Sequence, residues 1–318
     1  MNIGLDVMGG DFAPQNTVAG ALLALSEISR EDCIVLIGKE ELIAAELAKN
    51  NANPSLFKIV NATQVIEMSD KPLKAFQEKT NSSLSVGFRM LKSNDIDTIA
   101  SAGNSGALGA GAMQSVHNIP GIIRPCAATT LARENGGYNL LLDIGATTDV
   151  KPDVMAQFGL IGSIYAQALL KIEHPRVCLL NIGTEDTKGN LQCQTAFRLM
   201  QDNKAYNFIG NLEPRSIFSN EADVFVTDGF VGNILLKQIE TFYHLMVKRN
   251  YKDSFITNFN YELHGGSPIL GVNAPVVLGH GISTPLAIKN MILLSKRMVD
   301  THMTEKLKQA FSQYADNF

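Results

Sequence analysis

Short apolar runs alternate with longer segments of helical periodicity along this 318-residue chain. Many of the short runs are apolar at consecutive positions, which is typical of strands covered on both faces. The pattern predicts strands at Ile3–Val7, Ile34–Ile37, Phe57–Val60, Thr98–Ser101, Leu140–Ile144, Val177–Asn181, Asn207–Ile209, Val224–Thr227 and Val276–Leu278. It predicts helices at Gln15–Leu25, Glu40–Lys49, Leu84–Lys92, Ala107–Val116, Val154–Leu170, Gln192–Asp202, Val231–Lys248 and Pro285–Tyr314.

Strands and helices that alternate in this way indicate an α/β fold, with a mostly parallel sheet and helices on both faces. No repeat of fixed period and no shift in composition marks a boundary inside the chain. We therefore predict a single domain over residues 1–318.

The composition excludes several classes of protein. Apolar residues make up 45% of the chain and charged residues only 18%, whereas soluble domains carry about 25% charged residues. Such a chain can bury a large core, which excludes a disordered or fibrous protein. The net charge of −4 disfavours an electrostatic clamp on nucleic acid.

Several sequence features bear on location. No apolar run approaches the roughly 20 residues of a membrane-spanning helix, and Met1–Asp6 lacks the basic start of a signal peptide. The cysteines show no C-x-x-C spacing, which fits reduced thiols. They are Cys33, Cys126, Cys178 and Cys193. We expect a cytoplasmic protein.

Glycine-rich or polar turns follow many of the predicted strands. In open α/β sheets, ligands bind at the carboxyl ends of the strands. A single such turn is explained by the tight bends that glycine permits, but six on one edge predict a large polar ligand site. The turns are Met8–Asp11, Ala102–Gly106, Gly145–Thr147, Gly183–Asp186, Asp228–Gly229 and Gly279–Gly281.

The segment Ser101–Ala107 follows a strand and opens a helix. Unpaired N–H groups at a helix start bind anions, glycines allow close approach, and the Ser105 hydroxyl adds a donor. Close helix–sheet packing through small residues explains the glycines equally well. The chain contains neither a P-loop nor a dinucleotide-binding G-x-G-x-x-G after its first strand, so hydride transfer to a nicotinamide has little support.

Two further segments offer donors for a developing negative charge. Lys188 is the only cation in Asn181–Asn190, and it suits a phosphate or an oxyanion. Asn233 lies in the first turn of the helix after Asp228, where its amide suits an oxyanion hole. The alternatives are a solvated loop at Lys188, and capping by Asp228 with an exposed Asn233.

The turn Asp6–Asp11 offers two carboxylates and two glycines, which suit acid–base chemistry or a metal. The alternative is a turn that leads into a helix starting near Pro14. Because the chain has no H-E-x-x-H motif and no Cys/His cluster, we expect no metal ion. Among the histidines, His280 alone lies in a glycine turn.

Seven motifs, in order, resemble the phosphate acyltransferase (PlsX) family over about residues 1 to 300. They are Asp6–Asp11, Asn81–Ser83, Ser101–Ala107, Leu141–Ala146, Gly183–Asn190, Thr227–Asn233 and Gly279–Gly281. The resemblance implies a Rossmann-like α/β/α sandwich, a homodimer, no cofactor and peripheral contact with the inner face of the cell membrane.

The resemblance also implies a reaction. Inorganic phosphate and a fatty acyl thioester of acyl carrier protein give acyl phosphate and free carrier, for a glycerol-3-phosphate acyltransferase downstream in bacterial phospholipid synthesis. Because phosphate is itself the nucleophile, no serine or cysteine of the enzyme has to form an acyl intermediate. The enzyme must orient an anion against a carbonyl and supply donors for the oxyanion.

The motifs assign residues to that reaction. Lys188 and Asn233 match the family's catalytic positions. We hypothesise that Lys188 neutralises charge on phosphate or the tetrahedral intermediate, and that Asn233 donates to the oxyanion. The expected phosphate- and substrate-binding residues are Asp6, Gly9, Gly10, Asp11, Ser82, Ser83, Gly103, Asn104, Ser105, Gly106, Asp143, Gly183, Thr184, Asp228, Gly229 and His280.

The chain departs from the family pattern at three places. Thr147 stands where members usually have Asn, and Phe76–Thr80 is less basic. The helical projection, about 231–264, is shorter and less rich in lysine. It keeps an apolar stripe of Leu235, Ile239, Phe242 and Met246, followed by the cations Lys248, Arg249 and Lys252. These cations suit the acidic carrier or an anionic lipid surface, and the alternative is a helix that faces the core or a dimer partner.

Two other functions stay open at the level of sequence. A phosphotransacetylase that acts on coenzyme A thioesters would use the same attack of phosphate on a thioester. A catalytically inert protein that binds acyl groups or their carrier is the alternative from a different class.

Overall fold

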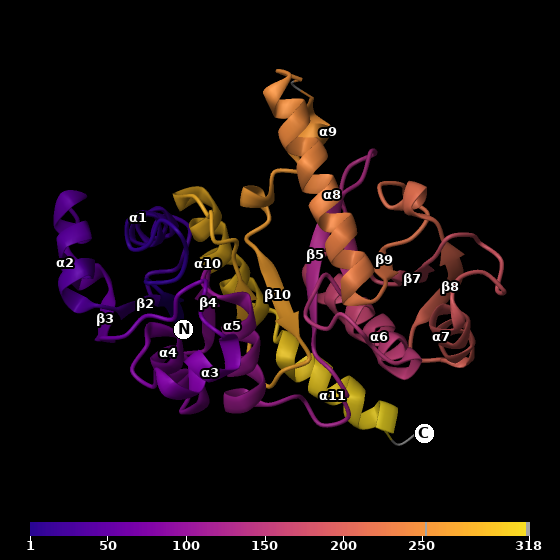
Figure 1. Cartoon of the computed structure of the whole chain (residues 1–318), viewed down its shortest axis with the longest axis horizontal. Helices are drawn as coiled ribbons and strands as arrows, with labels where there is room; N and C mark the ends of the chain where they lie inside the picture. Colours follow the sequence, from indigo (N-terminus) through magenta and orange to yellow (C-terminus); the bar gives the residue numbers. More distant parts are fainter. Residues whose placement is uncertain (252, 316–318) are drawn as a thin grey trace. The chain divides into compact units, whose positions relative to one another are not determined.

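The computed structural model describes residues 1–251 and 253–315. The chain forms two compact units (Figure 1). Unit 1 consists of Met1–His117 and Tyr261–Asp300, and unit 2 consists of Asn118–Asn260 and Thr301–Phe318. The single domain expected from the sequence stays a prediction, and each unit is described by itself.

The sheet of unit 1 has the strand order β3-β2-β1-β4-β11-β10. Neighbouring strands pair in parallel, except that β10 and β11 are antiparallel. The strands are β1 (Asn2–Asp6), β2 (Cys33–Gly38), β3 (Lys58–Asn61), β4 (Thr98–Ser101), β10 (Ser267–Leu270) and β11 (Val276–Leu278). Nearly every residue of β1, β2 and β4 is buried, as strands covered on both faces require.

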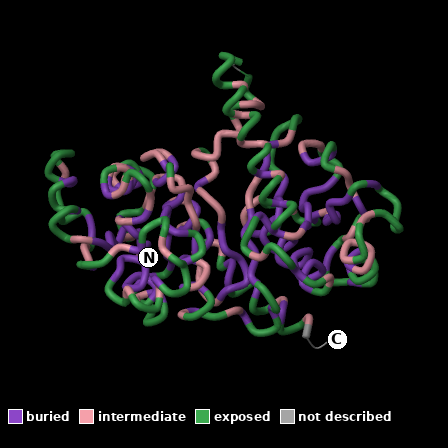
Figure 2. The backbone as a smooth tube through the Cα atoms, viewed as in Figure 1, coloured by how far each residue is buried: buried purple, intermediate pink, exposed green. Residues whose placement is uncertain are grey.

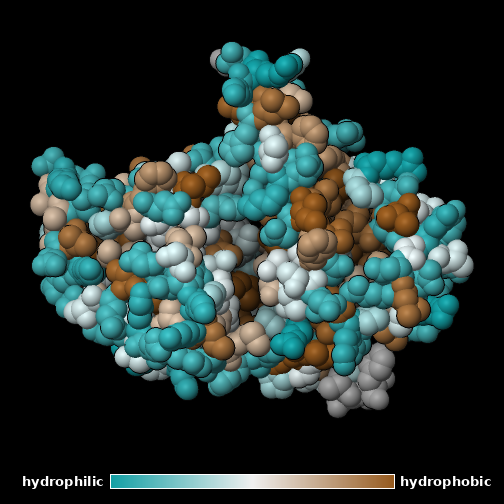
Figure 3. Space-filling view, in the orientation of Figure 1, coloured by the Kyte–Doolittle hydropathy of each residue, from teal (hydrophilic) through white to brown (hydrophobic). Residues whose placement is uncertain are grey.

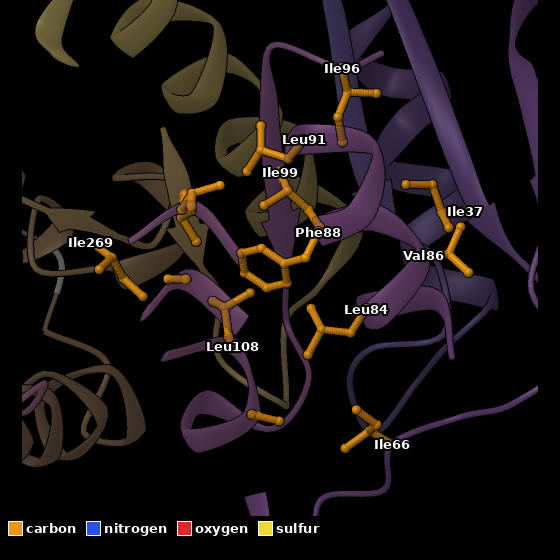
Figure 4. Packing of buried hydrophobic residues seen from close by; sticks show 14 of the residues in the cluster. Ile37, Ile66, Leu84, Val86, Phe88, Leu91, Ile96, Ile99, Leu108 and Ile269 are labelled. Atoms are coloured by element: carbon orange, nitrogen blue, oxygen red, sulfur yellow. The ribbon is translucent and has the colours of Figure 1, made fainter. Parts of the chain in front are cut away.

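Helices surround this sheet and close its core. They are α1 (Gln15–Ala24), α2 (Glu40–Lys49), α3 (Pro72–Glu78), α4 (Ser83–Lys92), α5 (Ser105–Gly111) and α10 (Pro285–Asp300), with the short turns η1 (Pro54–Leu56), η2 (Ala112–Val116) and η4 (Tyr261–Leu263). Phe88 of α4 lies amid Leu84, Ile99 and Leu108 (Figure 4). Its ring meets that of Phe76 edge to face, with centroids 5.7 Å apart.

The sheet of unit 2 has the order β5-β6-β9-β7-β8. β5 and β6 form an antiparallel hairpin, and the other neighbours are parallel. The strands are β5 (Cys126–Ala132), β6 (Tyr138–Leu142), β7 (Arg176–Leu180), β8 (Asn207–Leu212) and β9 (Val224–Val226). The remaining elements are α6 (Pro152–Leu169), α7 (Leu191–Asp202), α8 (Gly229–Lys248), α9 (Ser254–Thr257), α11 (Met303–Ala315) and the turn η3 (Pro214–Ser216).

The predicted projection corresponds to α8 and α9. Leu235 and Ile239 of α8 pack partly against the core of unit 2, but Phe242 is 54% exposed. Beyond Leu236 no residue of α8 is buried, as the tube in Figure 2 shows. The apolar stripe therefore faces the core only along the first half of α8. Lys252, the last cation of the predicted basic cluster, lies outside the described residues.

All nine predicted strands are present, and the α/β class with a mostly parallel sheet is confirmed. The single predicted helix Pro285–Tyr314 is wrong. The chain breaks between α10 and α11, where His302 takes a φ of 52° in the left-handed region. Among the described residues, no helix is both long and apolar enough to cross a membrane.

A buried ion cluster in unit 2 joins the end of β5 to the starts of β7 and β9. Asp223, before β9, is 3% exposed. Its carboxylate accepts from Arg133 Nη2 at 2.6 Å, and from Arg176 Nε and the Arg176 backbone at 3.0 and 2.7 Å. Burial by itself would raise the pKa of the Asp223 carboxyl, but the hydrogen bonds and charge of Arg176, with help from Arg133, outweigh it and lower that pKa.

We predict that Asp223→Asn lowers the free energy of unfolding by about 3–5 kcal/mol at pH 7, because two partly buried guanidinium groups lose their counter-charge. The folded pKa lies below the ordinary value of 3.8. The wild-type contribution is therefore complete above that value and is lost as pH falls through the folded pKa. Urea titrations from pH 2 to 7 measure both effects, and equal stability of the two proteins at pH 7 would contradict the prediction.

Candidate functional site

In unit 1 the predicted site residues begin with Asp6, the last residue of β1. The Asp6 carboxylate is 3% exposed and accepts hydrogen bonds from Ser101 Oγ at 2.7 Å and from the Met8 N–H at 3.1 Å. Burial raises the pKa of Asp6, and hydrogen bonds from Ser83 and Ser101 offset only part of that rise. A buried carboxyl therefore joins the end of β1 to the end of β4 and the start of α4.

The turns after β1 and β4 are in direct contact. A Cβ atom at Gly9 would lie 2.7 Å from Asp6 Oδ2 and 2.8 Å from the Gly103 nitrogen, so no side chain fits there. The contact follows from the parallel pairing of β1 with β4, which brings their carboxyl ends to the same edge of the sheet. The sequence prediction that these glycine turns meet is correct for Gly9 and Gly103.

A third turn joins them after β11, the parallel neighbour of β4 on its other side. The Asp11 N–H donates to the Gly281 carbonyl at 2.8 Å, next to Gly10 with its φ of 109°. His280 is half-buried, and its ring meets that of Tyr261 edge to face at 4.8 Å. The structure thus places His280 beside the Asp6–Asp11 turn.

Two of the predicted polar residues in unit 1 are helix caps. Ser82 caps α4 and is fully buried. Asn104 caps α5: its Oδ1 accepts from the Ala107 N–H at 3.0 Å, while its Nδ2 donates to the carbonyls of Glu67, Met68 and Asp70 at 3.1–3.3 Å. The amide of Asn104 is therefore committed to the protein backbone. The exposed groups at the start of α5 belong to Ser105 and Gly106.

In unit 2 the carboxylate of Asp143 is fully buried after β6. It accepts from the N–H groups of Ala127, Gly145, Ala146 and Thr147 at 2.7–3.2 Å. Burial raises the pKa of this carboxyl, and the four N–H donors lower it only in part. Asp143 thus determines the shape of the Gly145–Thr147 turn.

Asn233 lies against that turn. Its Nδ2 donates to the Ile144 carbonyl at 2.9 Å, and the residue is exposed. The start of α8 fits closely here because Gly232 has no side chain: a Cβ there would lie 1.9 Å from the Asp143 carbonyl oxygen. Asp228, before Gly229, caps α8 by accepting from the Val231 N–H at 2.8 Å. The parallel pairing of β6 with β9 brings these residues together.

Lys188 lies in the exposed loop between β7 and α7, with Thr184. A Cβ at Gly183 would lie 2.8 Å from Lys188 Cγ, so the lysine stem crosses over this glycine. Cys193, in the first turn of α7, is near Asp228: burial, followed by the negative charge of Asp228, raises the pKa of the Cys193 thiol. This thiol therefore adjoins both the Lys188 loop and the start of α8.

The predicted residues form one set in each unit. Unit 1 contains Asp6, Gly9, Gly10, Asp11, Ser82, Ser83, Gly103, Asn104, Ser105, Gly106 and His280, and unit 2 contains Asp143, Gly183, Thr184, Lys188, Asp228, Gly229 and Asn233. The described part of the chain contains no group of three or more His, Cys, Asp or Glu side chains placed to hold a metal ion.

Sequence reasoning missed two residues whose side chains hold the Lys188 loop by hydrogen bonds. Asn211 donates to the Glu185 carbonyl at 2.8 Å, and Gln194 donates to the Thr187 carbonyl at 2.8 Å. Asn211 lies in β8, well beyond the motif, so no local pattern points to it. Only its polarity at a buried strand position sets it apart.

Comparison with known proteins decides the family. The family model described as "Fatty acid synthesis protein" matches residues 1–306. A phosphate acyltransferase from Dictyoglomus thermophilum is 37% identical over 336 residues, with 99% of each chain covered. Another from Oceanobacillus iheyensis is 40% identical over 324 residues, covering 96% of this chain and 95% of the relative. The chain belongs to the phosphate acyltransferase family. The resemblance seen in the motifs is confirmed, and the protein is an acyltransferase.

Solved structures agree on the fold of this phosphate acyltransferase family member. A phosphotransacetylase from Streptococcus pyogenes has a TM-score of 0.67 at 19% identity, covering 94% of both chains. A branched-chain phosphotransacylase from Enterococcus faecalis has a TM-score of 0.63 at 15% identity, covering 94% of this chain and 99% of that one. At such identities the likeness establishes the α/β architecture alone.

We predict that Gly232→Ala destabilises the protein by about 1–3 kcal/mol, because the new methyl group would overlap the Asp143 carbonyl. Gly109→Ala is the matched control, since a Cβ at Gly109 meets no atom within 4 Å apart from its chain neighbours and the backbone of its own helix. Alanine at this helical position should stabilise the protein by about 0.5–1 kcal/mol. Thermal unfolding measures the stability of the two variants against wild type. A Gly232→Ala protein as stable as wild type would refute the close approach of Gly232 to the Asp143 carbonyl.

Proposed function

We propose that this protein transfers a fatty acyl group from the thioester of acyl carrier protein to inorganic phosphate, giving an acyl phosphate for bacterial phospholipid synthesis. The observation that carries the proposal is end-to-end similarity, over 99% of both chains, to a protein named phosphate acyltransferase. The sequence motifs between Asp6 and His280 indicate the same reaction.

The chemistry needs no covalent enzyme intermediate. A phosphate oxygen attacks the thioester carbonyl, a tetrahedral intermediate forms, and the carbon–sulfur bond breaks to release the carrier thiolate, which then takes up a proton. That thiolate has a pKa near about 8.5 and leaves with little help from a general acid. Cys193, which follows the Lys188 loop, fits this scheme, because burial raises the pKa of its thiol and so disfavours the nucleophilic thiolate.

Lys188 and Asn233 have distinct roles in the proposal. The Lys188 ammonium neutralises charge on phosphate or on the tetrahedral intermediate. The amide of Asn233 carries two N–H groups. One is bonded to the Ile144 carbonyl at 2.9 Å and orients the amide, so the other is the donor we assign to the oxyanion.

Phosphate binding in unit 1 is assigned to the start of α5. Because the Asn104 amide is committed to four backbone groups, the donors there are the Ser105 hydroxyl and the N–H groups of Ser105 and Gly106. Asp6, Ser83 and Gly103 contribute by holding the surrounding turns. No resident cofactor or metal ion is part of the proposal.

The second half of α8 is the surface we assign to partners. Phe242, Leu245 and Val247 are 54%, 44% and 49% exposed, and the cations Lys248 and Arg249 follow them. Apolar side chains gather beside and over α8 in Figure 3. The cations beside this apolar face suit an anionic membrane surface or the acidic carrier protein. The exposed apolar side chains by themselves suit the second copy of a homodimer.

Purified protein with palmitoyl-acyl carrier protein should form hydroxylamine-trappable acyl phosphate only when inorganic phosphate is present. Palmitoyl-coenzyme A and acetyl-coenzyme A, assayed in parallel, separate this function from that of a phosphotransacetylase. A phosphate-dependent product from coenzyme A thioesters alone would replace the carrier-dependent proposal. No product from any donor would favour an inert binding protein.

We predict that Lys188→Ala lowers turnover by about 10²-fold or more, because the developing negative charge loses its counter-charge. Lys204→Ala serves as the control, since Lys204 is an exposed cation in the same unit, beyond α7. We would compare the steady-state rates of the two variants with both substrates saturating. Matching circular dichroism spectra would show that both variants are folded. Wild-type turnover in Lys188→Ala would remove Lys188 from the mechanism.

A further inference from the structure

The loop Gly183–Asn190 is held by the side-chain amides of three residues. Asn181 follows β7 and is 6% exposed, and Asn211 lies in β8 and is 4% exposed. Gln194 lies in the second turn of α7. Each comes from a different element, and each donates to carbonyl oxygens of the loop. We call these three residues the amide clasp.

The amide clasp fixes both peptide groups of Lys188. The Lys188 N–H donates to the Glu185 carbonyl at 3.1 Å, and the same carbonyl accepts from Asn211 Nδ2 at 2.8 Å. The Lys188 carbonyl accepts from Asn181 Nδ2 at 3.2 Å. Two buried asparagines therefore determine where the backbone of Lys188 lies.

Gln194 fixes the residues on either side of Lys188. Its Nε2 donates to the Thr187 carbonyl at 2.8 Å and to the Gly189 carbonyl at 3.0 Å. The stem of Lys188 crosses Gly183, where a Cβ would lie 2.8 Å from Lys188 Cγ. The clasp therefore fixes the backbone from which the Lys188 side chain leaves, and Gly183 leaves room for the first part of that side chain.

Asn211 makes only part of the bonding that its amide allows. Its Oδ1 is buried and has no hydrogen-bond partner among residues 1–251 and 253–315. A buried acceptor without a partner opposes stability, so the net stabilisation by this side chain is small. A leucine of similar size would remove the unpaired acceptor along with the donor. The stability of the fold therefore does not explain why position 211 is an asparagine. The hydrogen bond from its side chain to the Glu185 carbonyl does explain it.

We propose that Asn181, Asn211 and Gln194 are positioning residues that hold the backbone of Lys188 for acyl transfer. The inference rests on the proposed function, in which the Lys188 ammonium meets a developing negative charge. A displacement of about 1 Å in a reacting constellation costs about 10²-fold in rate, so the clasp acts on turnover through Lys188.

Asn211→Leu tests the proposal, with Asn139→Leu as the matched control. Asn139 lies in the same unit, is fully buried, and donates from Nδ2 to the Ile217 and Ser219 carbonyls at 2.8 and 3.0 Å, in a segment without Lys188. We expect Asn211→Leu to lower kcat at least about tenfold, with KM for palmitoyl-acyl carrier protein within about threefold of wild type. Asn139→Leu should lower Tm more and leave kcat unchanged well below its Tm.

The double variant with Lys188→Ala separates positioning from a general structural role. If Asn211 acts through Lys188, Asn211→Leu should change turnover less than about twofold once Lys188 is already alanine. The same fold-loss in both backgrounds would overturn the proposal. So would an unchanged kcat in Asn211→Leu.

Hydrogen exchange over Gly183–Asn190 tests the clasp without any reaction. We expect the Lys188 amide to exchange at least about tenfold faster in Asn211→Leu than in wild type, because its acceptor carbonyl is no longer held. Unchanged exchange would contradict the positioning role itself. Failure of the wild-type protein to make acyl phosphate would instead contradict the proposed function, so the two failures are distinguishable.

Discussion

The turns after the parallel strands depend on one constraint, which is that buried polar groups must find partners. Asp143 supplies an acceptor where four backbone N–H groups converge. Asn104 supplies donors where three carbonyls converge. Because one side chain serves several backbone groups, each turn has few alternative shapes. Such turns suit a reaction in which phosphate brings its own nucleophilic oxygen and the protein supplies orientation.

Much of the fold follows from the sequence for a simple physical reason. Strands such as β1 and β4 are covered on both faces, so their apolar residues are consecutive and conspicuous. β5 and β10 lack this signal, because β5 mixes alanine with threonine and β10 contains a proline. The break after α10 depends on a left-handed residue, His302, and nothing in the apolar periodicity reveals it.

The site follows from the sequence only in part. Motif residues can be found because parallel strands place their carboxyl ends on the same edge, as for Gly9 and Gly103. The local sequence does not show which polar groups stay available to a ligand, because residues far away in the chain use some of them. The carbonyls that accept from the Asn104 Nδ2 lie 34–37 residues away in the chain, and Asn211 reaches a carbonyl 26 residues away. Only the folded structure shows that the Asn104 Nδ2 is committed to backbone carbonyls and that residues outside the motif hold the backbone of the Lys188 loop.

Direct attack of phosphate on the thioester is the central claim, and intact-protein mass spectrometry tests it most directly. The protein would be mixed with palmitoyl-acyl carrier protein, quenched at intervals shorter than one turnover, and weighed, with and without inorganic phosphate. The account predicts that the protein never gains the mass of an acyl group, while phosphate-containing mixtures release acyl phosphate from the first time point. A protein that becomes acylated without phosphate, and loses the acyl group when phosphate is added, would contradict it.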